Sequence, residues 1–582
     1  MNGKKNPKPG ERHSAPGLRP ATLAAAATLG GLAVSLALAY ASDGAYHDDD
    51  ICHYLFARDA WTDPNALLHW WARPGYNFPA ALAARFFGLA GCRILSGLMT
   101  AAVAWLAWLI ARRLVDDRRA AALAPALVWL QPLALTLSFT TLTETPAALY
   151  LTAGTWLFLR GNRVAGCGVL SLLFVTRLET LALAPLPLLL FALVDAAEPA
   201  GRAGRRPGKG PATEFPPGAA FPRPGALVRS LLGAPRNWAC GAVLMWAPVA
   251  WCLASAALRL DPGSSVLHLF SRPYSSEYGS GPAWHFLGVW PEAASYGLAA
   301  LAVTGAFAAG RRGLLASIPA GAFLALQSLL FALGIFASGG YARFMVTLAG
   351  LVGALASAGL AAGLGAAPGR ARAILGPAAL AALVVATALV RPLAHPAALV
   401  ALAALSLAYG LWAAWAALPF RRRLTRAFTV ACAGLALFQS ALMVRPLNLG
   451  DSPLSSLIRD GSRVAVTPRL SGRALLTQHV AAVYIRRNGT VYAYSNPDAR
   501  ARWEAAPPGT LFLWDNKYCY KKHTAADLEE SRDLWKALYR QGRVLYTGRR
   551  EGWAVVLFEK RGPGSAAGPE APPLESFSTP WP

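Results

Sequence analysis

The sequence predicts a polytopic α-helical membrane protein with about thirteen transmembrane helices and a small C-terminal α/β domain outside the membrane. Three observations lead to this prediction. Of the 582 residues, 55% are hydrophobic and only 15% are charged, which is too little charge for the surface of a soluble chain of this length. Apolar runs of membrane-spanning length recur from Ala21 to Val444. Arginines also gather in alternate connections between these runs.

The basic character of the chain fits a membrane protein better than a nucleic-acid-binding protein. The net charge is +25 and the isoelectric point is about 10.2, values that would favour nucleic-acid binding in a soluble protein. Here the basic residues lie in short connections such as Arg112–Arg113 and Arg311–Arg312. This is the positive-inside pattern of cytoplasmic loops, so nucleic acid is excluded as a partner.

The N-terminal segment predicts the orientation of the first helix. Residues 1–20 form a basic tail, and an apolar run follows at Ala21–Ala41. This run is too long for the core of a signal peptide, so we expect an uncleaved first span that leads from the cytoplasm to the outside.

The remaining spans follow by alternation within a membrane domain that covers residues 21–445. Expected spans include 92–111, 120–138, 146–159, 238–258 and 427–444. Loops 43–91 and 259–292 then lie outside. The Pro/Gly-rich and Arg-rich segment 196–236 reads as a cytoplasmic linker.

The composition changes near residue 450 from apolar to mixed. Residues 450–561 alternate between strand-like and helix-like spacing and predict the outer α/β domain. The expected strands are 463–467, 491–494, 510–514, 544–546 and 553–558, and the expected helices are 474–487 and 525–539. The Pro, Gly, Ser and Ala content of 562–582 predicts a disordered tail.

Three consecutive carboxylates follow the first span in loop 43–91. Asp48, Asp49 and Asp50 repel one another, and near a low-dielectric boundary they require a counter-charge, a metal or a raised pKa. Such a group suits a general base that takes a proton from an attacking hydroxyl. It also suits a divalent cation, Mg²⁺ or Mn²⁺, with Asp49 and Asp50 as ligands. A solvated acidic turn is the structural alternative.

Other charged residues lie at the outer ends of apolar runs. Glu144 precedes the span 146–159, and Arg177 and Glu179 interrupt an apolar stretch. Lipid exposure of such groups is costly, so we expect them to face the bundle interior, where they bind substrate or form a structural ion pair.

Two further arginines are candidates for holding substrate. Arg272 lies in the outer loop 259–292, whose Gly and Ser residues favour mobility. Arg343 starts a span shortly after Tyr341 and two glycines, 339 and 340, that permit close backbone approach. Arg343 can hold a phosphate by charge-assisted hydrogen bonds, or it can extend its side chain to the lipid headgroups.

In their order and sidedness, these motifs resemble the glycosyltransferase family C (GT-C) fold. That group includes the protein mannosyltransferases of family 39 and the aminoarabinose transferases. Members carry an acidic motif, often Asp-Glu, directly after the first span, with a Tyr a few residues later, and Asp50 and Tyr54 have that spacing. A later Arg-Phe at the start of a span is also typical, and Arg343-Phe344 fits it. This chain has Asp-Asp-Asp in place of Asp-Glu, which leaves the base open among Asp48, Asp49 and Asp50.

The resemblance implies an inverting membrane glycosyltransferase. The high Ala, Arg, Gly and Pro content is typical of a GC-rich bacterium, so we expect the protein in the bacterial inner membrane. A hexose or pentose would move from a polyprenyl-phosphate donor to a lipid, glycan or protein acceptor on the extracytoplasmic face. Arg343, with Arg177, would hold the leaving phosphate, and one of the three aspartates would deprotonate the acceptor. The main alternative is a multi-span transporter or flippase, but few ionisable residues lie within the spans and no inverted repeat is evident. A non-catalytic assembly protein is the third possibility.

Overall fold

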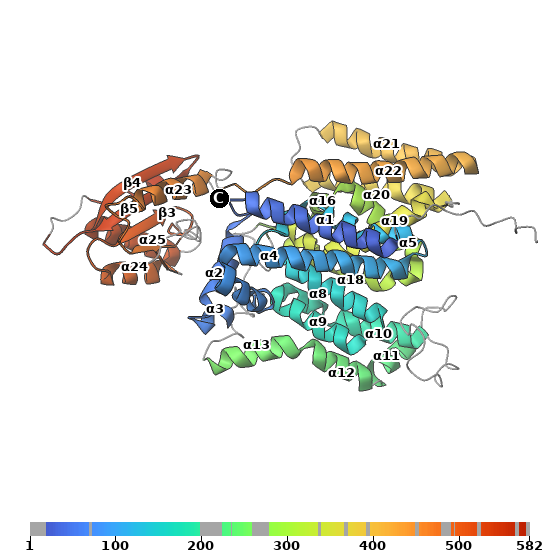
Figure 1. Ribbon diagram of the computed structural model, residues 1–582, viewed down its shortest axis with the longest axis horizontal. Helices are drawn as coiled ribbons and strands as arrows, with labels where there is room; N and C mark the ends of the chain where they lie inside the picture. The colour runs from blue at the N-terminus through green and yellow to red at the C-terminus, as the bar shows by residue number, and fades with distance from the viewer. Residues whose placement is uncertain are drawn as a thin grey trace, which may run out of the picture.

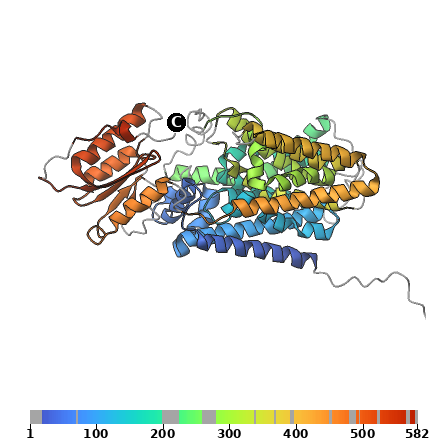
Figure 2. The ribbon, with the colours of Figure 1, turned by 90° about the horizontal axis from the view of Figure 1, so that it is seen from above.

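The computed structural model describes residues 19–68, 73–197, 224–233, 235–258, 279–335, 339–365, 370–390, 396–448, 453–478, 490–493, 495–520, 525–564 and 570–577. Long helices lie roughly side by side in a bundle, and a small sheet domain sits beyond one end of that bundle (Figure 1). A view turned by 90° shows the same division into two parts (Figure 2).

The first half of the bundle contains one long helix and many short ones. Its elements are α1 (Pro20–Ala41), α2 (Asp48–Asp59), α3 (Pro64–Leu68), α4 (Pro74–Leu114), α5 (Arg118–Ala122), α6 (Ala124–Trp129), α7 (Pro132–Leu137), α8 (Glu144–Leu159), α9 (Arg163–Thr176), η1 (Leu178–Leu183) and α10 (Pro185–Ala197). Prolines cause part of this fragmentation. Pro125 and Pro132 each begin a new helix, so the expected span 120–138 is divided among α5, α6 and α7.

The second half of the bundle leads to the sheet domain. Its elements are α11 (Pro224–Gly233), α12 (Pro235–Leu244), α13 (Trp246–Ala257), α16 (His285–Ala294), α17 (Tyr296–Ala309), η3 (Gly310–Gly313), α18 (Leu314–Ala332), η4 (Ala342–Leu348), α19 (Ala349–Leu364), α20 (Arg370–Val390), α21 (Pro396–Trp415) and α22 (Leu418–Met443). The expected linker 196–236 is therefore helical from Pro224 onward, and the expected loop 259–292 ends in helix α16.

The membrane-spanning nature of the bundle is clear, but the expected count of thirteen is not confirmed. Within the described residues, seven helical segments are long and apolar enough to cross a membrane. An eighth is present if α12 and α13, which meet at 44°, form one bent span. Shorter apolar helices such as Arg163–Thr176 fall below spanning length.

Helix α4 bends sharply where the chain enters the bundle. Gly88 adopts φ 61° and ψ −149° inside this 41-residue helix, a conformation that favours glycine. Before the bend, Phe78, Leu82 and Phe86 are exposed at four-residue spacing, so they line one side of the helix. This segment has the character of a helix that lies in the membrane interface.

Close helix contacts in the bundle use glycine. A Cβ atom on Gly305 of α17 would overlap the carbonyl oxygen of Leu355, and one on Gly359 of α19 would overlap that of Leu301. Small residues permit this backbone approach, which is the usual packing device between membrane helices.

The C-terminal domain is a five-stranded sheet covered on both faces. Its elements are α23 (Pro453–Ala465), β1 (Leu475–Thr477), β2 (Thr490–Tyr492), α24 (Asn496–Ala505), β3 (Leu511–Asp515), α25 (Ala525–Gln541), β4 (Gly542–Arg550), β5 (Trp553–Lys560) and η7 (Leu574–Phe577). The strand order is β2-β1-β3-β5-β4, with β2, β1 and β3 parallel and β5 antiparallel to both of its neighbours. Phe512 and Trp514 of β3 pack with α24 and α25, whereas Leu511 and Leu513 point to the opposite face.

Several expected elements of this domain are confirmed and others are wrong. The strands near 491–494, 510–514, 544–546 and 553–558 and the helix near 525–539 are present. Residues 463–467 instead end helix α23, whose apolar residues are buried against the sheet at helical spacing. Residues 475–477 form strand β1, not the start of a helix.

Part of the expected disordered tail 562–582 is ordered. Leu574 and Phe577 of η7 are buried against Trp514 and Trp535. The side chain of Asn516 also donates to the carbonyl oxygen of Phe577 at 2.9 Å. These contacts are long-range, so the local composition of the tail gave no sign of them.

Candidate functional site

The three aspartates form the first turn of α2, at the end of the bundle that faces the sheet domain. His47 caps this helix: its Nδ1 atom lies 3.4 Å from the backbone nitrogen of Asp49 and 3.3 Å from the Asp49 carboxylate. Negative charge is favourable at a helix N-terminus, which offsets part of the mutual repulsion. The preceding segment is anchored by Arg93, which donates to the carbonyl oxygens of Ser42 and Gly44.

The three carboxylates point to different partners. Asp50 is buried and accepts hydrogen bonds from the backbone and hydroxyl of Thr141, at 2.5 and 2.6 Å. Asp49 contacts Nη2 of Arg343 at 2.5 Å. Asp48 contacts Lys517 and Tyr518 of the C-terminal domain. Successive residues of an α-helix are rotated by about 100°, so adjacent side chains leave the helix in different directions.

Arg343 connects Asp49 to a second acidic group. Its Nε lies 3.4 Å from Glu144, at the start of α8, and the same Glu144 oxygen accepts from Arg177 at 3.1 Å. Arg177 also pairs with Glu179 at 2.6 Å, and Gln327 donates to Glu179 at 3.1 Å. Five of the predicted residues, Asp49, Glu144, Arg177, Glu179 and Arg343, therefore form one continuous charged cluster.

Aromatic rings line this charged cluster. The guanidinium of Arg177 lies 4.1 Å from the centre of the Phe344 ring, and that of Arg343 lies 4.9 Å from Tyr341. Cation–π contacts of this kind fix the arginine planes without neutralising their charge. Gly339 and Gly340, with φ of 56° and 62°, turn the chain immediately before Tyr341.

Arg73 is a member of the site that the sequence analysis missed. It is buried, has left-handed backbone geometry with φ 55°, and lies within electrostatic range of Glu179, Arg177 and Asp49. Burial lowers the pKa of Arg73 to about 10, and nearby Glu179 opposes this shift. A left-handed arginine is costly and concentrates at functional sites. The only sequence signal was an arginine before Pro74, a position where helical geometry is disfavoured.

The charge state of the cluster follows from its partners. Burial opposes ionisation of Asp49, but the adjacent His47 and Arg343 outweigh it and hold the pKa of Asp49 well below its usual range. One turn later on α2, burial lowers the pKa of His53 to about 3, against the opposing charge of Asp49. Asp49 is therefore anionic and His53 neutral at physiological pH.

Several buried polar atoms of the cluster lack a hydrogen-bond partner in the described structure. They are Nη1 of Arg343, the second carboxylate oxygens of Glu144 and Glu179, and the hydroxyl of Thr347. Such atoms are rare inside native proteins. Asp49 keeps 22% of its side-chain surface exposed, whereas Glu144 keeps 1%. The cluster thus has spare polar capacity and an accessible carboxylate, as a polar ligand requires.

Other predicted residues lie away from the cluster or outside the described residues. Tyr54 packs near Gly88 and Leu89 of α4. Arg272 falls in 259–278, which is not among the described residues. Within the described parts of the chain, no group of three or more His, Cys, Asp or Glu side chains is arranged to hold a metal ion. Because Asp49 and Asp50 point to Arg343 and Thr141, they do not present a common set of ligands, and the Mg²⁺ or Mn²⁺ requirement stays a prediction.

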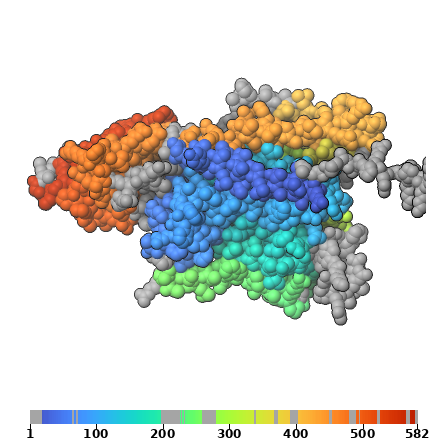
Figure 3. Space-filling model, viewed as in Figure 1, coloured from blue at the N-terminus to red at the C-terminus, as the bar shows by residue number. Residues whose placement is uncertain are grey.

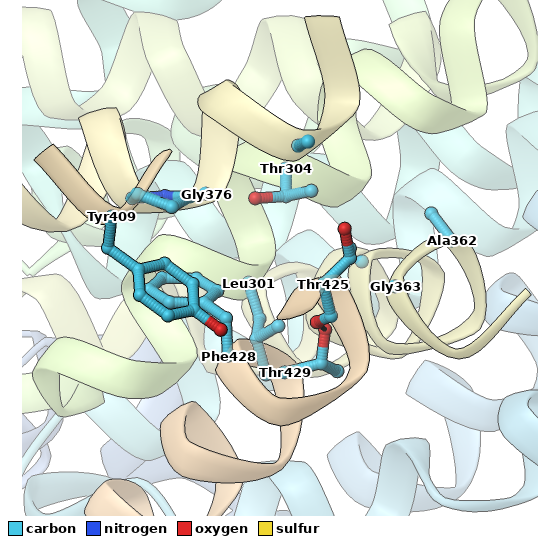
Figure 4. A pocket seen from close by; sticks show the side chains of 12 residues that line it. Leu301, Thr304, Ala362, Gly363, Gly376, Tyr409, Thr425, Phe428 and Thr429 are labelled. Atoms are coloured by element: carbon cyan, nitrogen blue, oxygen red, sulfur yellow. Dashed lines mark hydrogen bonds between the residues drawn. The ribbon is translucent and has the colours of Figure 1, made fainter. Parts of the chain in front are cut away.

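A small cavity lies elsewhere in the bundle and carries no charged group. Leu301 and Thr304 of α17, Gly363 of α19, Tyr409 of α21 and Thr425 of α22 are among its lining residues (Figure 4). Its volume of about 20 Å³ has room for a single water molecule. This cavity is too small for a substrate.

Comparisons with known proteins agree with this architecture. Residues 36–177 match the family model of dolichyl-phosphate-mannose-protein mannosyltransferase, a segment that includes Asp49, Glu144 and Arg177. Among seven matching chains of solved structures is ArnT from Cupriavidus metallidurans bound to undecaprenyl phosphate. The match has a TM-score of 0.52 at 16% identity and covers 94% of this chain and 99% of that chain.

The chain has the ArnT fold. This confirms the predicted resemblance to GT-C mannosyltransferases and aminoarabinose transferases. No curated protein sequence matches the chain. The ArnT likeness extends over the sheet domain as well as the bundle, since nearly the whole of both chains is covered.

Proposed function

We propose that this chain is a membrane glycosyltransferase that moves a sugar from a polyprenyl-phosphate donor to an acceptor hydroxyl. One observation carries the proposal: an accessible carboxylate, Asp49, lies against a buried arginine, Arg343, at one end of a membrane bundle. The mannosyltransferase family match supports the reaction class. The undecaprenyl phosphate bound to ArnT supports a polyprenyl-phosphate group in the donor.

Asp49 is the general base in this proposal. Asp50 is saturated by hydrogen bonds from Thr141 and Tyr46, and Asp48 is engaged by Lys517 and Tyr518. Asp49 is the aspartate whose described contacts join it to the Arg343 cluster. It takes the proton of the acceptor hydroxyl, and the acceptor oxygen attacks the anomeric carbon.

Arg343 holds the leaving group. As the new glycosidic bond forms on one side of the anomeric carbon, the bond to the phosphate oxygen breaks on the other, and the configuration inverts. The developing charge on the phosphate is stabilised by Nη1 of Arg343, which is buried and has no hydrogen-bond partner among the described residues. Arg73 adds positive charge nearby, while Glu144 and Arg177 hold Arg343 in place.

The low pKa of Asp49 describes the enzyme without bound donor, in which Arg343 is the partner of Asp49. A carboxylate with so low a pKa is a weak base. When the anionic donor phosphate binds Arg343, it offsets the positive charge that stabilises the carboxylate, and the pKa of Asp49 rises. Donor binding thus activates the base, so that deprotonation of the acceptor follows donor binding.

The sidedness of the molecule supports an extracytoplasmic site. The Arg-rich helix α5 lies at the end of the bundle opposite the sheet domain (Figure 1). Arg312 pairs with Asp116 at 3.1 Å, so two Arg-rich connections meet there. Under the positive-inside rule that end faces the cytoplasm. The charged cluster and the sheet domain then lie on the outer face of the bacterial inner membrane.

A transfer assay with the full-length protein in vesicles tests this function. Radiolabelled hexose and pentose polyprenyl phosphates are supplied as donors to bacterial membranes that contain lipid, glycan and protein acceptors. We expect transfer by the wild type and loss of transfer in Asp49→Asn and Arg343→Met, with Lys536→Met as a surface control. Full activity in Asp49→Asn would refute the base assignment. Parallel reactions with EDTA measure the Mg²⁺ or Mn²⁺ requirement.

A further inference from the structure

The helix that carries the acidic turn is shared between the two parts of the molecule. Ile51 and Leu55 of α2, four residues apart, are buried together with Leu513 of β3 and Leu557 of β5. On another side of the same helix, Asp49 meets Arg343 of the bundle. The sheet domain therefore supplies part of the hydrophobic surface that holds α2 in position. The space-filling view shows the sheet domain beside this end of the bundle (Figure 3).

A rigid turn of the sheet domain reaches the acidic turn directly. Oδ1 of Asp515, the last residue of β3, accepts hydrogen bonds from the backbone nitrogens of Lys517 and Tyr518, both at 2.9 Å. The buried side chain of Asn516 donates to Gly552 and Phe577 at 2.9 Å each. These bonds hold the turn to the sheet, and they do not depend on the contacts that Lys517 and Tyr518 make with the bundle.

Both side chains of the turn engage one carboxylate oxygen. Oδ2 of Asp48 accepts from the ammonium of Lys517 and, at 2.5 Å, from the hydroxyl of Tyr518. Lys517 keeps 30% and Asp48 keeps 21% of its side-chain surface exposed, so this contact lies at the edge of the site.

We propose that turn 515–518 positions the general base, with Lys517 and Tyr518 as positioning residues that act on Asp49 through Asp48. This proposal rests on the proposed glycosyl transfer. By holding Asp48 toward the sheet domain, the turn keeps that carboxylate from competing with Asp49 for Arg343. By supplying one positive charge, Lys517 offsets the repulsion among three adjacent carboxylates. The C-terminal domain is thus a component of the catalytic site.

A double-mutant cycle in full-length protein tests the proposal. We expect Lys517→Met to lower kcat roughly tenfold, the size of an ordinary coupling between contacting charges, with the donor KM changed less than twofold. Lys517→Arg should retain most of the activity. Asp48→Asn should lower kcat only a few-fold, and adding it to Lys517→Met should restore kcat to the Asp48→Asn level, because the free charge at position 48 is gone.

The matched control is Lys536→Met, which removes another lysine of the same domain, one exposed on α25. Tyr518→Phe, which removes a single hydroxyl, should lower kcat by less than Lys517→Met does. This second variant tests the same contact with Asp48 if Lys517→Met folds poorly. Equal kcat in Lys517→Met and Lys536→Met, or multiplicative losses in the double variant, would overturn the proposal. Failure of the proposed function is a separate result, since the wild type itself would then show no transfer, and failure of the base assignment would leave Asp49→Asn active.

Discussion

The guanidinium of Arg343 lies 2.5 Å from the carboxylate of Asp49, although 294 positions separate the two residues in the chain. This pair joins the first turn of α2 to η4 and, through Glu144, to α8. With 6% and 22% side-chain exposure, this ion pair incurs a desolvation penalty that its mutual attraction only partly offsets, so it is weak evidence for a purely stabilising role. Four predictions follow from the cluster and from the bundle that holds it.

The three aspartates should respond differently to removal of charge. Asp49→Asn should lower the transfer rate about a hundredfold or more, because the acceptor hydroxyl loses its base. Asp50→Asn should mainly lower the melting temperature, because it weakens the contacts with Thr141 and Tyr46. Initial rates and thermal unfolding of both variants in detergent distinguish these effects. Equal rate losses in Asp49→Asn and Asp50→Asn at unchanged stability would contradict the assignment.

Arg343 should not be replaceable by lysine. An ammonium is a compact charge that cannot span Asp49, Glu144 and a phosphate as a planar guanidinium does. Arg343→Lys should lower kcat/KM for the donor on the order of tenfold or more, the equivalent of about 1.5–3 kcal/mol for hydrogen bonds to a charged group. Arg312→Lys, at an exposed ion pair, is the control and should behave as wild type.

His53 should make the stability of the protein depend on pH. Its pKa is about 3 in the folded protein, against an ordinary value of about 6.5 in the unfolded chain. Between these values the unfolded chain binds one more proton, so stability is complete above about pH 6.5 and falls as the pH drops, by up to about 1.4 kcal/mol per pH unit. His53→Gln should flatten the melting temperature between pH 7 and pH 4. An unchanged slope in that variant would refute the prediction.

The contact between α17 and α19 should not tolerate larger side chains. Gly305→Leu would force atoms against the backbone of α19 and should destabilise the protein by about 1–3 kcal/mol. Gly321→Leu is the matched control, since nothing lies within 4 Å of a Cβ atom at Gly321 of α18. Thermal unfolding of the two variants gives the comparison, and equal melting temperatures would contradict this packing.

The general character of the site could be predicted from sequence because charge is rare in this bundle. An arginine or carboxylate at the end of an apolar run must find a polar environment. For this reason the sequence indicates Asp49, Glu144, Arg177, Glu179 and Arg343 as candidates, and the structure brings these five side chains together. The separate directions of Asp48, Asp49 and Asp50 depend on where α2 begins. No spacing in the sequence indicates that start, which is capped by His47.

Long-range contacts account for most of what sequence could not predict. Arg73 joins the cluster through a left-handed turn, and periodicity does not detect a single backbone conformation. Strand β1 has three residues and depends on pairing with β2 and β3, so the helix predicted over 474–487 is wrong for 475–477, while 479–487 lie outside the described residues. The predicted count of spans is not confirmed for a local reason: prolines divide apolar runs into helices too short to cross a bilayer alone.

The shared position of α2 also governs when the protein can become active during its synthesis. Residues 48–59 leave the ribosome more than 450 residues before the sheet strand and turn that hold them, 511–518. A nascent chain whose spans are already inserted would still have an acidic turn without its final partners. If the turn positions the base as proposed, translation must pass residue 518 before this protein can transfer sugar, and chains terminated before that turn should be inert in the membrane.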